Sequence, residues 1–242
     1  MRCFFFVALQ TLLNVFRDGA IKIIHADPPY ANYRHQGDGR YCGGALLGAE
    51  TDAASATEAI TVTVDLLREW GPKIAAGGVL LLWQAAGPLR KPIGAAVEQY
   101  GWAVENVVVW NKGNVQPGNF EKPYSTQCEW LWILKRCGDN LINHDNSARG
   151  DILSFPQPHP VAGVLHRHHA FEKPEALMAF LIGKHSYEGE MVFDAFGCTG
   201  SACVVAQKLN RRWVYAESNL ENYQIGLRRL NSAGAMTTSA AG

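Results

Sequence analysis

Residues 192–202 read Val192-Phe193-Asp194-Ala195-Phe196-Gly197-Cys198-Thr199-Gly200-Ser201-Ala202. The pattern predicts a buried strand over 191–196, a turn of small residues, and a helix over 200–210. A glycine-containing turn at this place lets a ligand approach the backbone. Glu217 ends the next predicted strand, where an acidic side chain can hydrogen-bond a ribose diol. The segment therefore indicates a nucleotide-type cofactor site, with ordinary strand–helix packing as the alternative.

Strands and helices alternate along the rest of the chain. Further strands are expected over 20–26, 79–83 and 212–216, and further helices over 57–74, 89–100, 174–183 and 220–230. Residues 103–110 and 127–134 are expected to form a long antiparallel hairpin. This order is typical of an open α/β sheet.

Size and composition indicate one enzyme-sized domain. The chain has 242 residues, of which 48% are hydrophobic and 18% charged. We expect a single domain over 1–231, with a long loop at 31–56, a short variable segment at 137–168, and a disordered tail at 232–242. Lys+Arg and Asp+Glu both total 22, so contact with nucleic acid must come from a local patch and not from a wholly basic surface.

The cysteines and the first residues bear on location. Six cysteines are scattered without a CxxC pair, as in a reduced, cytoplasmic protein. The apolar residues 1–9 superficially resemble a signal peptide, but no clean cleavage site follows before Arg17, so a buried first element is expected. No run reaches the ~18 uninterrupted apolar residues that a membrane span needs.

A second segment, Asp27-Pro28-Pro29-Tyr30, follows the strand predicted over 20–26. In open α/β sheets, ligands bind at the carboxyl ends of the strands. Because proline lacks an N–H, the Asp27 carboxylate and the Pro28 carbonyl present acceptors without competing donors, and Tyr30 adds a flat aromatic face. Two acceptors and one stacking plane suit a planar ring that bears an exocyclic amine. A Pro-Pro turn with a helix-capping aspartate is the structural alternative.

Three further groups of side chains are interpreted as structural. Arg211-Arg212 and Arg228-Arg229 are expected at solvated helix ends. The tryptophans on predicted strands are expected to pack in the core, and they are Trp83, Trp102, Trp110, Trp130, Trp132 and Trp213.

Several motifs together resemble one enzyme family. Residues 27–30 resemble the catalytic motif of nucleic-acid amino-methyltransferases that depend on S-adenosylmethionine, and residues 194–201 are similar to that family's cofactor motif. Residues 169–174 resemble its His-x-x-x-Lys-Pro element, and residues 109–112 with 129–135 resemble its hairpin region. Their order, with the catalytic motif first, is that of the β group of DNA amino-methyltransferases.

The resemblance covers about residues 10 to 230. It implies the class I methyltransferase fold, a Rossmann-like, mostly parallel open sheet with an antiparallel hairpin edge. It also implies methyl transfer from S-adenosylmethionine to N6 of an adenine flipped out of DNA, because Asp stands first in the motif. No metal is implied. The implied catalytic residues are Asp27, Pro28, Pro29 and Tyr30, and the implied cofactor-binding residues are Asp194, Phe196, Gly197, Gly200, Ser201, Glu217, Lys173 and His169.

The chain departs from the family pattern in three places. Ala195 and Cys198 stand where the family usually has Pro and Gly, and residues 137–168 are too few for a full target-recognition domain. Three alternatives therefore stay open: an RNA adenine methyltransferase, a cytosine-N4 methyltransferase, and a weakly active subunit that supports a partner methyltransferase. The expected partner is DNA, together with a second copy of the chain or a recognition protein, and no membrane.

Overall fold

The computed structural model describes residues 2–5, 12–28, 56–84, 90–113, 127–157 and 172–239, with residues 2–5, 56 and 235–239 described by their backbone only. The strands in these ranges form one eight-stranded sheet in the order β1-β8-β7-β2-β3-β5-β4-β6. They are β1 (Arg2–Phe5), β2 (Ile21–Ala26), β3 (Ile74–Gln84), β4 (Trp102–Asn111), β5 (Cys128–Arg136), β6 (Ile152–Ser154), β7 (Met191–Asp194) and β8 (Arg212–Ala216).

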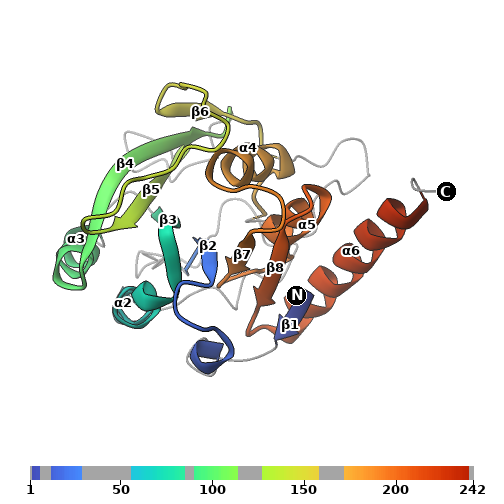
Figure 1. The fold of residues 1–242 in the computed structure, drawn as a ribbon, viewed down its shortest axis with the longest axis horizontal. Helices are drawn as coiled ribbons and strands as arrows, with labels where there is room; N and C mark the ends of the chain where they lie inside the picture. The colour runs from blue at the N-terminus through green and yellow to red at the C-terminus, as the bar shows by residue number, and fades with distance from the viewer. Residues whose placement is uncertain are drawn as a thin grey trace, which may run out of the picture.

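The strand directions confirm the predicted fold class. β5 runs antiparallel to both β3 and β4, and the other neighbouring strands pair in parallel. The expected hairpin of β4 and β5 is therefore present in a Rossmann-like, mostly parallel sheet (Figure 1). The hairpin does not form the edge itself, because the short β6 pairs with the outer side of β4.

Helices cover both faces of the sheet (Figure 1). They are α2 (Ala56–Trp70), α3 (Arg90–Gln99), α4 (Glu175–His185), α5 (Ser201–Lys208) and α6 (Leu220–Ser239), with the 3-10 turns η1 (Leu13–Val15) and η2 (Gly71–Lys73). Leu66 of α2 packs in one core cluster with Leu80 of β3. Leu181 of α4 and Val204 of α5 pack in a second cluster with Leu81 of β3. The tryptophans expected in the core are buried there, except Trp130, which is partly exposed.

The order of the strands places a ligand site beside β2. All six residues of β2 are buried, as in a strand covered on both faces. From β2 the sheet continues to β3 on one side, whereas β7 and β8 lie on the other. Strand order thus reverses between β2 and β7, and in open α/β sheets ligands bind at the carboxyl ends of the strands at such a point. Residue 27 follows β2 and residue 195 follows β7 at this crevice.

Two predicted boundaries are wrong. β3 begins at Ile74, within the segment expected to be helical, and runs through Gly77-Gly78. Gly77 has φ +65°, and the register between β2 and β3 shifts between Ile21 and Ile23. The glycine pair therefore marks an irregularity within the strand and not a turn before it.

The second concerns the tail at 232–242, which was expected to be disordered. Its residues up to Ser239 are helical, because α6 continues to that residue. Ala233 is buried in the same cluster as Leu230, and the Leu230 carbonyl accepts a hydrogen bond of 3.0 Å from Gln207 Nε2 of α5. Packing against α5 thus extends a helix that its small, polar composition would not support alone.

The two segments predicted as loops are described only in part. Nearly all of 31–56 lies outside the described residues, and 137–168 is described to residue 157, where it contains β6. In the described part of the chain, no helix is long and apolar enough to cross a membrane. Cys128, Cys137, Cys198 and Cys203 are free thiols.

Candidate active site

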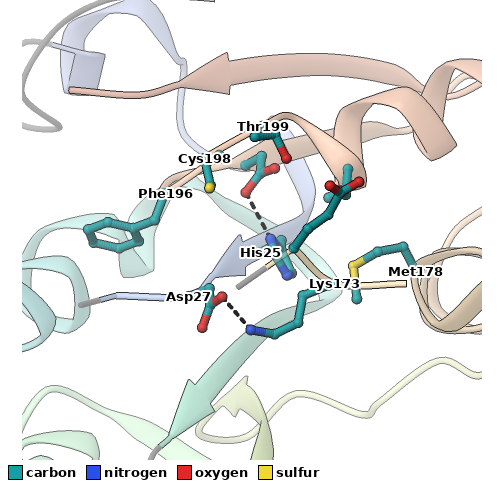
Figure 2. A pocket seen from close by; sticks show the side chains of 12 residues that line it. His25, Asp27, Lys173, Met178, Phe196, Cys198 and Thr199 are labelled. Atoms are coloured by element: carbon teal, nitrogen blue, oxygen red, sulfur yellow. Dashed lines mark hydrogen bonds and ion pairs between the residues drawn. The ribbon is translucent and has the colours of Figure 1, made fainter. Parts of the chain in front are cut away.

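A pocket opens at the reversal of strand order. Figure 2 shows it between the end of β2, the turn after β7 and the segment before α4. Its lining residues are His25, Asp27, Glu172, Lys173, Met178, Asp194, Phe196, Gly197, Cys198, Thr199, Ser201 and Ala202. The pocket therefore brings together six predicted site residues, Asp27, Lys173, Asp194, Phe196, Gly197 and Ser201. Gly200 and Glu217 are outside this lining, and Pro29, Tyr30 and His169 lie outside the described residues.

Asp27 is the first residue after β2. Its side chain is 19% exposed, and the following Pro28 is buried. The Nζ of Lys173 donates to Asp27 Oδ2 across the pocket (Figure 2). A carboxylate fixed at the carboxyl end of a central strand, beside an open pocket, can accept hydrogen bonds from a polar ligand.

Lys173 also belongs to a larger buried cluster. Its Nζ lies 3.0 Å from Glu129 Oε2 of β5, and Glu129 Oε1 lies 2.6 Å from Lys112 Nζ, just beyond β4. Burial alone would lower the pKa of Lys173, but Asp27 and Glu129 outweigh it and raise that pKa above its ordinary value. Burial alone would raise the pKa of Glu129, but Lys173 and Lys112 hold that pKa below its usual range. Lys173 and Glu129 are therefore both charged at neutral pH.

The turn after β7 is shaped by close contacts with β8. A Cβ on Gly197 would stand 2.1 Å from the ring of Tyr215, so only glycine fits there. Cys198 adopts φ +45°, which is unusual for a residue with a side chain. Its N–H donates to Glu217 Oε2 at 2.7 Å, and its carbonyl accepts from the Tyr215 hydroxyl. Glu217 therefore acts on the site indirectly, because it holds the backbone of the turn in place.

Gly200 closes the same turn. It has φ +78° at the start of α5, and a Cβ there would stand 3.4 Å from the Cα of Gly226 in α6. Positive φ and a close helix contact both favour glycine at this position.

A second clamp on the turn comes from α6. Arg229 Nη1 donates to the Thr199 carbonyl at 2.7 Å and to Ser201 Oγ at 3.1 Å, while its Nη2 lies 2.8 Å from Glu172 Oε1. The Arg229 side chain is only 10% exposed. The prediction of a solvated helix end is therefore wrong for Arg229, although its neighbour Arg228 is exposed.

Arg211 departs from the same prediction. Its guanidinium donates to the Leu209 carbonyl at 2.6 Å and to the Ser186 carbonyl at 2.5 Å. These bonds join the end of α5 to the end of α4, so Arg211 has a structural role between two helices.

His25 is a site residue that the sequence interpretation missed. The Trp83 indole donates to His25 Nε2 at 2.9 Å, and His25 Nδ1 lies 2.8 Å from Asp194 Oδ1. Because an indole N–H can only donate, Nε2 is the acceptor and Nδ1 carries the proton that Asp194 accepts. The only sequence signal was a polar residue within a mostly apolar strand, two positions before Asp27.

The lining suits S-adenosylmethionine, the cofactor implied by the sequence motifs. Three carboxylates, of Asp27, Glu172 and Asp194, line the pocket against one ammonium group, of Lys173, together with the ring of Phe196. Acidic groups and an aromatic ring attract a cationic ligand, and a sulfonium is such a cation. The tight turn at Gly197 also lets a ligand approach the backbone.

Solved structures share this fold. The M1.HpyAVI–SAM complex gives a TM-score of 0.69 at 16% identity, covering 96% of this chain and all (100%) of that chain. The PvuII DNA methyltransferase, described as cytosine-N4-specific, gives a TM-score of 0.73 at 15% identity, covering 93% of this chain and 85% of that chain.

Sequence comparison identifies the family. The type II methyltransferase M2.LlaDCHI of Lactococcus lactis subsp. cremoris is 24% identical over 241 residues, covering 91% of this chain and 86% of that protein. A family model described as DNA methylase (N6_N4_Mtase) matches residues 21–228. The chain therefore belongs to this DNA methylase family, and it is a DNA methyltransferase that uses S-adenosylmethionine.

Proposed function

We propose that the chain methylates N6 of adenine in DNA, with Asp27 as the catalytic carboxylate. The observation that carries this proposal is the shared pocket. Asp27 at the end of β2 and the turn 195–200 after β7 face the same cavity (Figure 2). A methyl donor held at the turn and an amine held at Asp27 would therefore lie side by side.

The bound cofactor supplies an electrophilic methyl group, so the chain needs neither a nucleophile of its own nor a metal. Asp194, Phe196, Gly197 and Ser201 would hold the cofactor from the pocket wall. Gly200 and Glu217 would act indirectly, by fixing the conformation of the turn. His169 is proposed as a further cofactor residue from its sequence motif alone.

The substrate end is assigned to residues 27–30. A base within a duplex cannot reach such a pocket, so it is flipped out at a cost of a few kcal/mol. Stacking on Tyr30 would offset about 1–3 kcal/mol of that cost. The Asp27 carboxylate and the Pro28 carbonyl would accept the amine protons, and they would stabilise the positive charge that develops on the nitrogen. Pro29 would keep the segment rigid.

Substitution of Asp27 tests this assignment. Asp27→Ala should abolish transfer of radiolabelled methyl groups to DNA, while calorimetry still detects S-adenosylmethionine binding. Asp27 follows β2 and pairs with Lys173, whereas the turn follows β7, so cofactor affinity should survive. Methyl incorporation that persists in Asp27→Ala would overturn the proposed role.

The choice of adenine follows from Asp27, since cytosine-N4 enzymes of the resembling family more often carry Ser at that position. RNA adenine and cytosine-N4 remain the competing substrates. Nucleoside analysis of methylated DNA and RNA would separate them: N6-methyladenosine from RNA or N4-methylcytosine as the main product would each contradict the proposal.

The organisation of the protein is also a proposal. We infer one methyltransferase domain, extended by α6 to residue 239, that acts in the cytoplasm on DNA as a dimer or with a recognition partner. The short segment at 137–168 supports the need for such a partner. Light scattering of the purified chain with and without DNA would measure the assembly, and a chain that stays monomeric yet methylates one sequence would contradict it.

A further inference from the structure

Four charged side chains form a row that begins at Asp27 and leads away from the pocket. Their order is Asp27, Lys173, Glu129 and Lys112, and each is within ion-pair distance of the next. The least buried of them, Asp27, is 19% exposed, and it lines the pocket together with Lys173. The members come from the end of β2, the segment before α4, strand β5 and the end of β4. Only the folded sheet brings them together.

Two tryptophan rings enclose the middle of the row. Lys173 Nζ lies 4.9 Å from the ring centre of Trp83 and 5.9 Å from that of Trp110. Both indoles are fully buried, so they keep water away from the ammonium group. In such surroundings a charge is strongly disfavoured unless it is partnered, and each of these charges has a partner of opposite sign.

The alternation of sign has a consequence for catalysis. Positive charge develops on the amine nitrogen next to Asp27, so an unbalanced ammonium group on Lys173 would oppose it. Glu129 neutralises the far side of Lys173, and Lys112 neutralises Glu129 in turn. The row therefore gives Asp27 a firm donor, and its four charges together sum to zero.

We propose that Lys173, Glu129 and Lys112 are positioning residues for methyl transfer, which act by orienting the Asp27 carboxylate. This inference rests on the proposed role of Asp27. It assigns Lys173 to the substrate side of the pocket and not to the cofactor, because its ammonium group is already shared by two carboxylates. It also makes the β4–β5 hairpin part of the catalytic machinery through Lys112 and Glu129.

Glu129→Gln tests the central link, because glutamine keeps the shape and the acceptor but removes the charge. We expect kcat to fall about 10- to 100-fold, since small losses of alignment have effects of this size. The dissociation constant for S-adenosylmethionine should stay near the wild-type value. A residue that held the cofactor would raise that constant instead.

The double variant Lys112→Met/Glu129→Gln separates charge balance from simple damage. It removes one charge of each sign and restores neutrality around Lys173, so kcat should recover part of the loss seen in Glu129→Gln. Unrelated structural damage would make the double variant worse than either single variant. If Glu129→Gln fails to fold, Lys112→Met tests the outer end of the row, because it removes the partner that holds Glu129; a folded Lys112→Met with wild-type kcat would then contradict the inference.

The same hairpin offers a matched control. Lys135 and Glu105 form an ion pair of 2.7 Å on β5 and β4, away from the row. Glu105→Gln should leave kcat unchanged. Wild-type kcat in a folded Glu129→Gln, or a double variant whose loss is the product of the two single losses, would overturn the inference. An inactive wild-type chain, or an active Asp27→Ala, would instead refute the proposed function itself.

Discussion

His25 Nδ1 donates to Asp194 Oδ1 at 2.8 Å, and this bond joins β2, which leads to Asp27, to β7, which leads to the turn 195–200. His25 lies two residues before Asp27 in β2, and Asp194 is the last residue of β7. Both side chains are almost completely buried. Under the proposed function, this hydrogen bond would help to set the distance between the methyl donor and the amine.

Removal of the imidazole should weaken both the fold and the cofactor site. His25→Ala leaves the buried Asp194 carboxylate without this donor, which costs about 1–3 kcal/mol of unfolding free energy. Urea unfolding and calorimetry with S-adenosylmethionine measure the two effects. His25→Asn is the matched control, because its amide nitrogen can take the place of Nδ1. Equal losses of cofactor affinity in the two variants would contradict a role for the hydrogen bond.

Arg229 should be required for tight cofactor binding, although it is absent from the pocket lining. Its guanidinium holds Thr199 and Ser201 in place, so Arg229→Met should loosen the turn and raise the dissociation constant for S-adenosylmethionine about tenfold, or about 1.4 kcal/mol. Arg228→Met changes the exposed neighbour on the same helix and should have no such effect. Equally tight binding of S-adenosylmethionine in both variants would show that the turn keeps its conformation without Arg229.

Replacement of Cys198 in the turn by glycine should stabilise the protein. Cys198 has φ +45°, a conformation that costs a residue with a side chain about 1–2 kcal/mol. Glu217 and Tyr215 hold only its backbone atoms, so Cys198→Gly keeps both contacts and should raise the melting temperature. Cys198→Val should lower it, because a branched side chain tolerates positive φ poorly. Thermal melts of the two variants would test this prediction. A higher melting temperature for Cys198→Val than for Cys198→Gly would contradict it.

Stability should decline in mildly acidic solution because of His185. Burial lowers the pKa of this histidine from 6.5 to about 4. Its neutral form is therefore favoured by folding, and this contribution is present above pH 6.5 and lost progressively as pH falls toward 4. Between pH 6.5 and 5 the loss should reach about 2 kcal/mol.

Urea unfolding at the two pH values would measure this loss, and His185→Asn should reduce it. His144, whose pKa burial also lowers, adds a smaller contribution of the same sign. A pH dependence that is unchanged in His185→Asn would assign the effect to other groups.

Local patterns in the sequence predicted the parts of the site that are contiguous in the chain. The mostly apolar strand before Asp27 and the strand–turn–helix around Gly197 each lie within a dozen residues, and the alternating order of elements predicted the mostly parallel sheet. The structure places both segments in one pocket, as the motifs implied.

The contacts between these segments could not be predicted in the same way. Lys173 and Asp27 are 146 residues apart, and His25 and Asp194 are 169 apart. The order of strands in the sheet and the burial of side chains bring such partners together, and a short sequence pattern carries no information about either. The length of α6 was missed for a similar reason, because Ala233 is buried by tertiary packing and not by helix propensity.

The order of strands also governs when the protein can first become active during synthesis. β2 needs β7, and β1 needs β8, although their partners are made long after them. A nascent chain that already carries Asp27 therefore keeps one side of β2 unpaired until the last third emerges from the ribosome. Such delayed pairing slows folding and exposes an aggregation-prone edge, so chaperones that shield strand edges should govern the yield of active enzyme in the cell.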